Sequence, residues 1–376
     1  MSRTLLFCAW GFLAVLFLGI TIWLLIAGDS ITAEMKKNQP SAEVRFVNAP
    51  AQDQSGTKAT DRPVIQKDEL EKSDPGRRIE KPDAPTSEQA NLSPNAKPLM
   101  RTEVKKSTLQ LHPHPDPQLV EKASIGPLPI IGKDGRQAWQ VYARPFSKLD
   151  KRPRIAVVFT DLGVSANATE SVIQNLPGSI SLAFAPFARR LKEWIKISRA
   201  AGHEVLVGLP MEPIDYPVND PGPYTLLTSL PEDQNKQRIH WVLSRLTGYV
   251  GVSTFMASKF TVKPDKLRPV ILELKSRGLM LLDVRENPLS SAMGIARKVQ
   301  MPAIARDLYL DGVATRESIR ARLAQAEKIA KSRGHAVAVA RPYPVSVTEI
   351  ARWAKDVRNR GVTLAPVSAL VKLAQQ

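Results

Sequence analysis

The sequence predicts an α/β fold, a distorted (β/α) barrel in which a curled sheet of parallel strands is surrounded by helices. From Arg154 onward, short apolar runs alternate with longer helical stretches, which is the pattern of consecutive β-α units. The runs are almost continuously apolar, as expected for parallel strands that have helices on their faces. The eight runs cover residues 154–159, 179–184, 203–209, 249–254, 279–284, 303–310, 335–340 and 362–367. Seven or eight such units favour a barrel over an open sheet.

The helical stretches between these runs carry apolar residues on one face only. In residues 315–333 the apolar side chains recur every three or four positions and charged residues fill the positions between them. A further helix is predicted to begin at a capping box made by Ser229 and Glu232. Helices with one apolar face are what the outside of such a sheet requires.

Residues 4–28 predict an anchor in a membrane. This segment carries no charge, and as a helix it would span about 37 Å, enough to cross a bilayer. Arg3 precedes it and acidic residues follow it, so residues 1–3 are expected in the cytoplasm and the rest of the chain in the periplasm, as a single-pass protein of the inner membrane. A signal peptide that is cleaved near Ala27-Gly28-Asp29 is the alternative.

The chain between this segment and the barrel predicts a disordered linker over residues 29–124. It is rich in Pro and polar residues and poor in aromatic ones, so it has too little apolar surface to offset the entropy of ordering. The folded domain is expected over residues 125–376, and it begins with a hairpin that turns at Lys133-Asp134-Gly135. The only cysteine, Cys8, excludes an intramolecular disulfide and a zinc site built from cysteines.

Candidate functional residues follow the predicted strands, because the chemistry of a βα barrel gathers at the C-terminal ends of its strands. We take Asp161, Asp283 and Arg285 as candidates for catalysis. The substrate cleft is expected to contain Thr160, Glu212, Phe255, Ser258 and Arg341. These strand ends offer carboxylates and arginines but no histidine.

Several motifs resemble those of the divergent polysaccharide deacetylases. They include TDLG at 160–163, LPMEPIDYP at 209–217 followed by DPGP, GVSTFMASKFT at 251–261 and GLMLLDVRENP at 278–288. The resemblance runs through nearly all of residues 154–370 in the same order. It implies a deacetylase-type (β/α) barrel. It also implies that in active relatives a divalent metal, held by an aspartate and histidines, activates water to remove an N-acetyl group while a second carboxylate takes the proton.

This chain departs from the family pattern at the residues on which that chemistry depends. The family motif DDLG retains its second aspartate as Asp161, whereas the first is replaced by Thr160, which cannot act as a general base near neutral pH. Gly208, Phe255 and Arg341 stand where the family has active-site histidines. Zinc sites rely on imidazole or thiolate ligands, so no metal or other cofactor is expected.

Two alternatives to a vacant metal site remain open. Oxygen ligands from Asp161, Glu212 and Asp283 would suit magnesium, and a rebuilt zinc or magnesium site would make the protein an active carbohydrate N-deacetylase. Conversely, ion pairs of Asp161 with Arg285, or of Asp283 with Arg341, would close the old cavity. The remaining His203, His240 and His335 are expected on the surface or at element ends, away from the strand ends that would hold a metal.

The charge of the chain bears on its partners. Residues 153–376 contain 31 Lys and Arg against 19 Asp and Glu, a net charge of +12. In the periplasm this favours an anionic polymer of the envelope or the phosphate-rich membrane surface over nucleic acid. An envelope glycan or a protein partner is expected from the family resemblance and the missing histidines. We therefore expect a membrane-anchored protein that binds glycan or a partner without metal, with the active deacetylase as the alternative.

Overall fold

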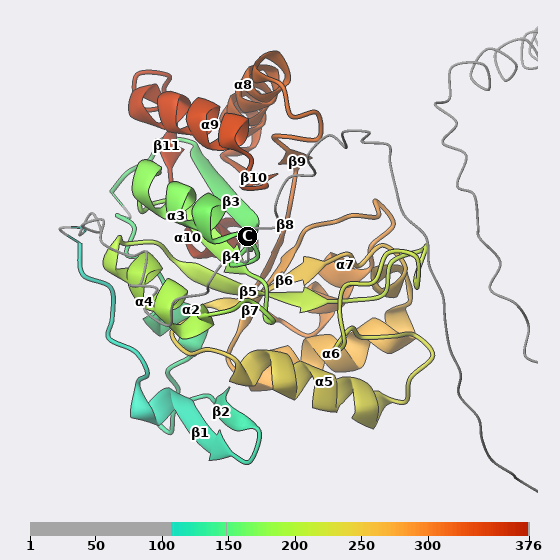
Figure 1. Cartoon of the computed structure of the whole chain (residues 1–376). Coiled ribbons are helices and arrows are strands. Elements are labelled where there is room, and N and C mark those ends of the chain that lie inside the picture. Colours follow the sequence, from blue (N-terminus) through green and yellow to red (C-terminus); the bar gives the residue numbers. More distant parts are fainter. Residues whose placement is uncertain (1–106, 108, 148, 375–376) are drawn as a thin grey trace, which may run out of the picture. The chain divides into compact units, whose positions relative to one another are not determined.

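The computed structural model describes residues 107, 109–147 and 149–374, whose main part is a curled parallel sheet surrounded by helices (Figure 1). The strands of this sheet are β3 (Arg154–Leu162), β4 (Ser181–Phe184), β5 (Val205–Pro210), β6 (Gly251–Phe255), β7 (Met280–Asp283), β8 (Ala303–Ala305), β9 (Leu308–Tyr309), β10 (His335–Ala340) and β11 (Thr363–Leu364). Their order is β8-β7-β6-β5-β4-β3-β10-β9, and β11 pairs with the first residues of β3. Each apolar run predicted as a strand contains at least one, so the predicted parallel sheet with outer helices is confirmed. It forms a half-barrel, whereas the sequence predicted a barrel.

The two end strands of this sheet, β8 and β9, are consecutive in the chain. The sequence predicted one strand over residues 303–310, but the segment divides into two short strands with different neighbours. The N–H of Arg306 donates to the carbonyl of Asp283 beside β7, and the N–H of Asp307 donates to the carbonyl of Val337 in β10. This segment therefore leaves one edge of the sheet and joins the other within two residues.

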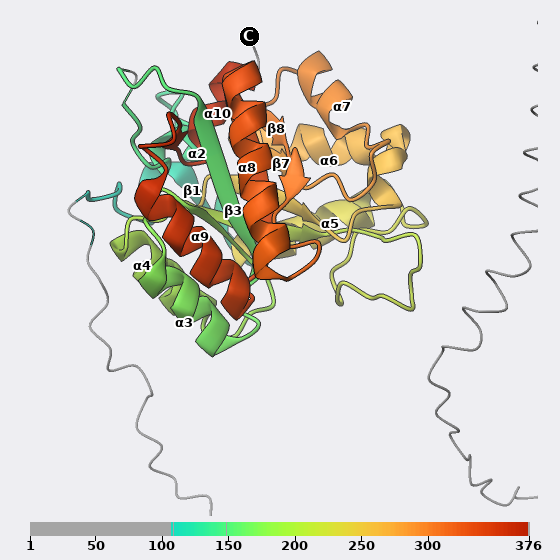
Figure 2. The same cartoon turned by 90° about the horizontal axis from the view of Figure 1, so that it is seen from above.

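Helices follow most strands and lie outside the sheet (Figures 1 and 2). They are α3 (Ala166–Asn175), α4 (Leu191–Ala200), α5 (Glu232–Ser244), α6 (Pro264–Ser276), α7 (Ala292–Lys298), α8 (Arg316–Arg333), α9 (Pro344–Asp356) and α10 (Ser368–Ala374), with the 3₁₀ turn η2 at Phe260–Val262. In α8 the apolar face predicted from the sequence is buried at Ile319, Leu323 and Ala326. The predicted capping box is wrong, because α5 begins after Pro231 with no side-chain cap, and Ser229 lies two residues before that position.

Ordered structure begins earlier than predicted. Residues 109–124, assigned to the linker from their composition, include the 3₁₀ turn η1 (Pro117–Leu119) and β1 (Val120–Ala123), which pairs with β2 (Gly126–Pro129). The hairpin turn therefore lies at residues 124–125. The predicted turn at Gly135 leads instead into the short helix α2 (Ala138–Val141). Composition missed this segment because its one fully buried side chain, Leu119, packs on distant parts of the domain.

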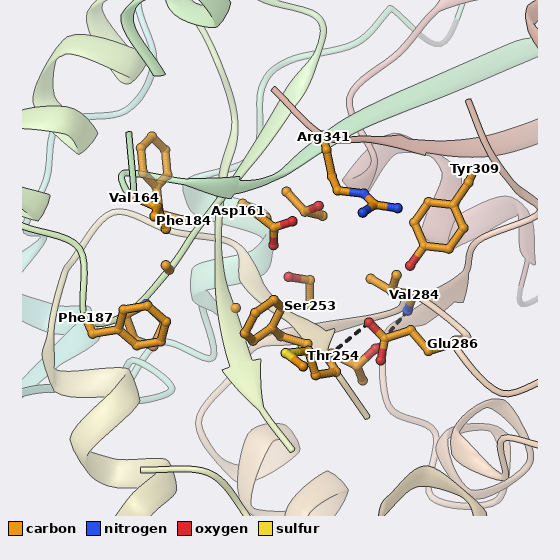
Figure 3. A pocket seen from close by; sticks show the side chains of 17 residues that line it. Asp161, Val164, Phe184, Phe187, Ser253, Thr254, Val284, Glu286, Tyr309 and Arg341 are labelled. Atoms are coloured by element: carbon orange, nitrogen blue, oxygen red, sulfur yellow. Dashed lines mark hydrogen bonds between the residues drawn. The ribbon is translucent and has the colours of Figure 1, made fainter. Parts of the chain in front are cut away.

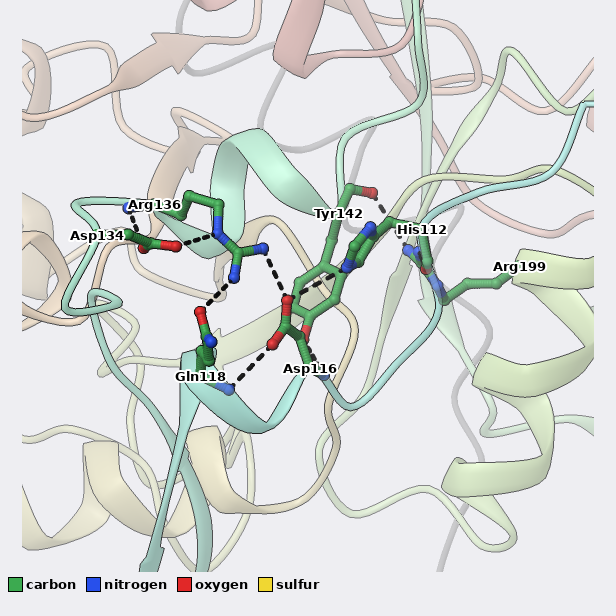
Figure 4. A network of polar contacts seen from close by, with 7 residues as sticks. All are labelled: His112, Asp116, Gln118, Asp134, Arg136, Tyr142 and Arg199. Carbon is green, nitrogen blue, oxygen red and sulfur yellow. Dashed lines mark hydrogen bonds and ion pairs between the residues drawn. The ribbon is translucent and has the colours of Figure 1, made fainter.

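A polar network attaches this N-terminal segment to the domain (Figure 4). The carboxylate of Asp116 accepts hydrogen bonds from the N–H of Gln118 and from the guanidinium of Arg136. Arg199, a buried residue of α4, donates to the carbonyl oxygens of His112, Tyr142 and Gly248. These contacts lie at the N-terminal edge of the sheet, opposite the strand ends where function was predicted.

The histidines occupy structural positions. His335 begins β10, and His240 on α5 binds Glu273 of α6. His203 is fully buried, so the expectation of a surface position is wrong for it; its Nδ1 lies 2.8 Å from the main-chain carbonyl of Ile180. Burial lowers the pKa of His203 to about 4, so the ring is neutral.

The predicted membrane segment, residues 4–28, lies outside the described residues. Among the helices that the structure does describe, none combines the length and apolar character needed to cross a bilayer.

Candidate functional site

A cavity of about 350 Å³ opens at the C-terminal ends of the strands (Figure 3). Its walls come from β3, β4, β5, β6, β7, β9 and β10 and the loops that follow them. The side chains and backbone that line it belong to Thr160, Asp161, Val164, Ala183, Phe184, Ala185, Pro186, Phe187, Gly208, Ser253, Thr254, Phe255, Met256, Val284, Glu286, Tyr309 and Arg341. Four of the predicted site residues are among them: Thr160, Asp161, Phe255 and Arg341.

Asp161 lies near the end of β3 in a strained backbone conformation. The pairing of β3 with β4 shifts register between Phe159 and Leu162, and Asp161 within this irregular stretch has a φ of 61°. A positive φ is uncommon outside glycine, although aspartate tolerates it better than most residues. Burial raises the pKa of Asp161, opposed by Arg341 and by a hydrogen bond with Thr160, while the nearby Asp311 raises it further.

Arg341 follows β10 and carries a cation into the same space. Its backbone N–H donates to the carboxylate of Asp311 at 2.7 Å, and its Nη1 donates to the hydroxyl of Tyr343 at 3.2 Å. Among the described residues its Nε and Nη2 make no hydrogen bond, and no carboxylate lies within the 4.0 Å of an ion pair. Figure 3 shows the guanidinium between the carboxylate of Asp161 and the ring of Tyr309. Arg341 therefore keeps donors available to a ligand.

Glu286 is a cavity residue that the sequence analysis did not single out. Its carboxylate accepts hydrogen bonds from the backbone N–H groups of Met256, at 3.0 Å, and of Ala257. Burial raises the pKa of Glu286 to about 7, and the charges of Asp161 and Asp283 add to this rise while the two N–H groups oppose it. Near neutral pH the cavity therefore holds a carboxyl group that both accepts and donates protons.

The remaining walls differ from one side of the cavity to the other. Tyr309 of β9 directs its hydroxyl toward Glu286, and its ring lies 3.8 Å from the guanidinium carbon of Arg306. Arg306 donates to the carbonyl oxygens of Val284 and Arg285, so its position is fixed by the backbone. The opposite wall is apolar and is built from Val164, Phe184 and Phe187, and Phe255 also lines the cavity. The cavity is thus polar on one side and aromatic on the other.

The other predicted site residues do not line the cavity. Asp283 is buried and accepts hydrogen bonds from the N–H of Arg285 and the hydroxyl of Ser290, so it holds the loop after β7. Arg285 is exposed, at a φ of 51°. Both residues lie at or just after the end of β7, close to the cavity. The loop after β7 turns so that Glu286, the residue after Arg285, lines the cavity instead.

Glu212 and Ser258 also hold loops together. The carboxylate of Glu212 accepts from the N–H and hydroxyl of Thr228 and from Nζ of Lys259, which joins the loop after β5 to the loop after β6. The hydroxyl of Ser258 accepts from the N–H of Ile214. Both residues are engaged by the protein itself and do not reach the cavity.

The ion pairs expected to close the cavity are not formed. Within the described part of the chain, neither Asp161 with Arg285 nor Asp283 with Arg341 comes within the distance of an ion pair. Asp283 is engaged by its own loop, and the charged group that faces Asp161 is Arg341 (Figure 3). The cavity therefore stays open.

The donor set of the cavity does not fit a metal ion. Where the family pattern has active-site histidines, this chain has an aromatic ring at Phe255, a guanidinium at Arg341 and no side chain at Gly208, and none of the described histidines lines the cavity beside the retained Asp161. In the described ranges no three His, Cys, Asp or Glu side chains come together as a metal site would require. The three oxygen ligands considered for magnesium, Asp161, Glu212 and Asp283, do not converge on one point, because Glu212 and Asp283 are held in separate loops.

A parallel half-barrel of β-α units, with a cavity at the C-terminal ends of its strands, defines a barrel-type α/β protein whose ligand site lies in the loops. Within that class, the chain belongs to the divergent polysaccharide deacetylase family, whose model matches residues 157–371.

Three proteins similar to this chain are described as uncharacterised. An uncharacterised protein of Escherichia coli strain K12, YibQ, is 25% identical over 222 residues, which are 59% of this chain and 68% of that protein. An uncharacterised protein of Haemophilus influenzae is 23% identical over 195 residues, which are 52% of this chain and 68% of that protein. The crystal structure of an uncharacterised protein of Agrobacterium tumefaciens C58 has 36% identity and a TM-score of 0.64, over 65% of this chain and 99% of that one.

Proposed function

We propose that this protein binds an envelope glycan in the cavity without a metal ion and without hydrolysing it. One observation carries the proposal. The positions at which the chain departs from the family's active-site pattern, Thr160, Gly208, Phe255 and Arg341, all line one cavity together with the retained Asp161. The cavity in which relatives would perform deacetylation is thus retained, whereas the side chains that would perform it are replaced.

The two walls of the cavity suit a sugar. The aromatic rings that line the cavity, among them Phe187 and Phe255, offer flat apolar surfaces on which the C–H face of a pyranose packs. The polar side, with Asp161, Glu286 and Arg341, offers acceptors and donors for hydroxyl and acetamido groups. A cavity of about 350 Å³ falls within the range of small-molecule sites.

Arg341 supplies the positive charge that a metal would otherwise place beside Asp161. A guanidinium binds oxygen atoms through several N–H groups in a fixed plane, but it does not lower the pKa of bound water as a metal does. The site is therefore suited to hold a carbonyl or hydroxyl oxygen and not to activate water.

The proposed setting is the periplasmic face of the inner membrane. Residues 4–28 would anchor the chain and the linker predicted from the sequence would tether the domain, with a span on the order of 50 to 60 Å for a flexible chain. The net charge of +17 supports an anionic polymer of the envelope or a protein as a further partner, and no nucleic acid is expected there.

A binding experiment tests the proposal. The full chain in detergent micelles is titrated with N-acetylglucosamine oligomers in a calorimeter, in the presence of EDTA, and acetate release is followed in parallel. We expect saturable binding, no acetate, and a loss of about tenfold in affinity, or 1.4 kcal/mol, for Arg341→Ala. Arg320→Ala is the matched control, since Arg320 on α8 pairs with Glu349 away from the cavity. Absence of binding, or equal loss in both variants, would contradict the proposal.

An active carbohydrate N-deacetylase with a rebuilt site is the second candidate. It is favoured by the two carboxyl groups in one cavity, Asp161 and Glu286, because a group with a pKa near 7 suits a general base. It predicts acetate release that Glu286→Gln abolishes and that added zinc or magnesium increases. Release in the same titrations would establish this candidate instead.

A further inference from the structure

The loops around the mouth of the cavity expose large apolar side chains. We define the apolar rim as Val164, Phe187, Ile214, Val218, Leu289 and Val313. Val218 is 87% exposed and Leu289 is 79% exposed, so these side chains are almost as accessible as in an unfolded chain. Exposed apolar side chains gathered on one surface mark a site of interaction, whereas isolated ones need no explanation.

The fold places the rim residues on one surface. Each follows a strand of the parallel sheet, and the C-terminal ends of these strands lie at the same edge. Ser258 joins three of the loops, because its hydroxyl accepts from the N–H of Ile214 and its carbonyl accepts from the side chain of Asn287. Val164 and Phe187 also line the cavity itself. The rim is therefore continuous with the mouth of the cavity.

Val164 and Phe187 also serve the proposed glycan site, but neither that site nor the fold accounts for the other rim residues, Ile214, Val218, Leu289 and Val313. Ile214, Val218 and Leu289 contribute little to the core because they are exposed. Aliphatic side chains also give a glycan neither hydrogen bonds nor the flat aromatic surface on which sugars pack. The surface that contacts the rim must itself be apolar.

We propose that the apolar rim docks on the anionic lipid bilayer, with the cavity mouth facing the membrane. Arg189 and Arg285 are exposed on the loops that carry Phe187 and Leu289, so two of the rim loops present a cation beside their apolar side chains, which favours an anionic membrane. The loop that carries Ile214 and Val218 instead exposes Asp215 and Asp220, so its contact with the bilayer would rest on the apolar side chains alone. The expected anchor at residues 4–28 and the linker would keep the domain within tens of ångströms of that bilayer. In this respect the inference rests on the proposed function. The sugar that enters the cavity is then one presented at the membrane surface.

A quenching experiment on the full chain tests the docking. Cys8→Ser removes the native thiol, Val218→Cys introduces a site for an environment-sensitive fluorophore, and the chain is reconstituted into vesicles of phosphatidylethanolamine and phosphatidylglycerol that contain spin-labelled lipid. Leu272→Cys is the matched control, because Leu272 is an exposed apolar residue on α6, away from the rim. We expect about threefold more quenching at position 218 than at position 272. Equal quenching at the two positions would overturn the proposal and favour a protein as the occupant of the rim.

A second variant separates this proposal from the glycan site. Ile214→Asp combined with Val218→Asp places charges on the rim, and a fluorophore at Leu289→Cys reports on docking. We expect the quenching at position 289 to fall to the level of position 272, while glycan affinity in detergent stays unchanged, since neither substituted residue lines the cavity. Persistent quenching would contradict the docking. If the parent chain does not bind glycan but its rim is quenched, the proposed function is contradicted and the docking proposal is supported.

Discussion

The polar groups at the N-terminal edge of the sheet and those at its C-terminal edge differ in how many of their hydrogen bonds are made within the protein. At the N-terminal edge, Glu204 is fully buried and its carboxylate accepts hydrogen bonds from Arg144 N, Ser181 Oγ, and the N–H and hydroxyl of Ser368. Arg199 at the same edge gives its donors to three carbonyl oxygens. Glu204 and Arg199 are therefore satisfied by the protein itself, whereas Nε2 of the nearby buried His203 has no hydrogen-bond partner among the described residues.

At the C-terminal edge several polar groups have hydrogen-bond donors or acceptors that the described part of the protein does not itself use. Arg341 retains free donors, Glu286 has a pKa raised to about 7, and Asp161 has a raised pKa in a backbone conformation with positive φ. Met256 and Arg285, which also have positive φ, lie at the same edge. Unpaired polar groups and strained backbone persist in proteins where function requires them. The polar groups at the N-terminal edge therefore stabilise the fold, whereas those at the C-terminal edge are available to bind a ligand.

The largest expected effect is on stability at the N-terminal edge. Glu204→Ala leaves buried N–H groups of Arg144 and Ser368 without an acceptor, and each such group costs about 1 to 3 kcal/mol. We expect the free energy of unfolding, measured by urea denaturation, to fall by about 3 to 5 kcal/mol. Asp161→Asn, the control at the other edge, should change it by less than about 1 kcal/mol. Similar losses in the two variants would show that the edges do not differ as described.

The second effect is a dependence of stability on pH that arises from Glu286. Its pKa rises from 4.5 in the unfolded chain to about 7 in the folded one, so between these values the folded state binds more protons than the unfolded state. Stability contributed by this group is therefore present below pH 4.5 and is lost as the pH rises toward 7. Glu286→Gln should match the parent near pH 4.5 and exceed it by about 2 to 3 kcal/mol at pH 8. A constant difference across this range would exclude a raised pKa.

The smallest expected effect concerns the backbone of Asp161. At a φ of 61°, glycine avoids the strain that a Cβ atom introduces, whereas alanine keeps it. We expect Asp161→Gly to be about 1 kcal/mol more stable than Asp161→Ala in urea denaturation. The reverse order would show that β3 relaxes into an ordinary conformation at this position. The comparison between two variants cancels the loss of the carboxylate, which both share.

The sequence predicted the parts of this molecule that depend on local patterns. The strands were found because each is a nearly continuous apolar run, and Thr160, Asp161, Phe255 and Arg341 were found because they directly follow such runs or belong to a recognisable motif. The sequence did not predict which way a loop turns. Arg285 and Glu286 are adjacent, and only the left-handed conformation of Arg285 decides that Glu286 enters the cavity.

Long-range contacts explain the other differences from the sequence analysis. The segment of residues 109–124 is too polar to predict as ordered, and it is held by Leu119 in the core and by Arg199 far along the chain. His203 is fully buried, although its place at a strand start suggested a surface or capping position. Such outcomes depend on which distant residues meet, and a local pattern carries no information about that.

The most direct test of the metal-free cavity is the metal content of the full chain. The protein in detergent is dialysed against zinc, manganese or magnesium, then against buffer, and analysed for elements beside an Asp161→Ala control. The account predicts far less than one metal ion per chain, with the same value in the control, because Phe255 stands at the position of the metal-binding histidine and Arg341 places a cation beside Asp161. One bound metal ion per chain that is lost in Asp161→Ala would contradict it and would restore the deacetylase as the function of this cavity.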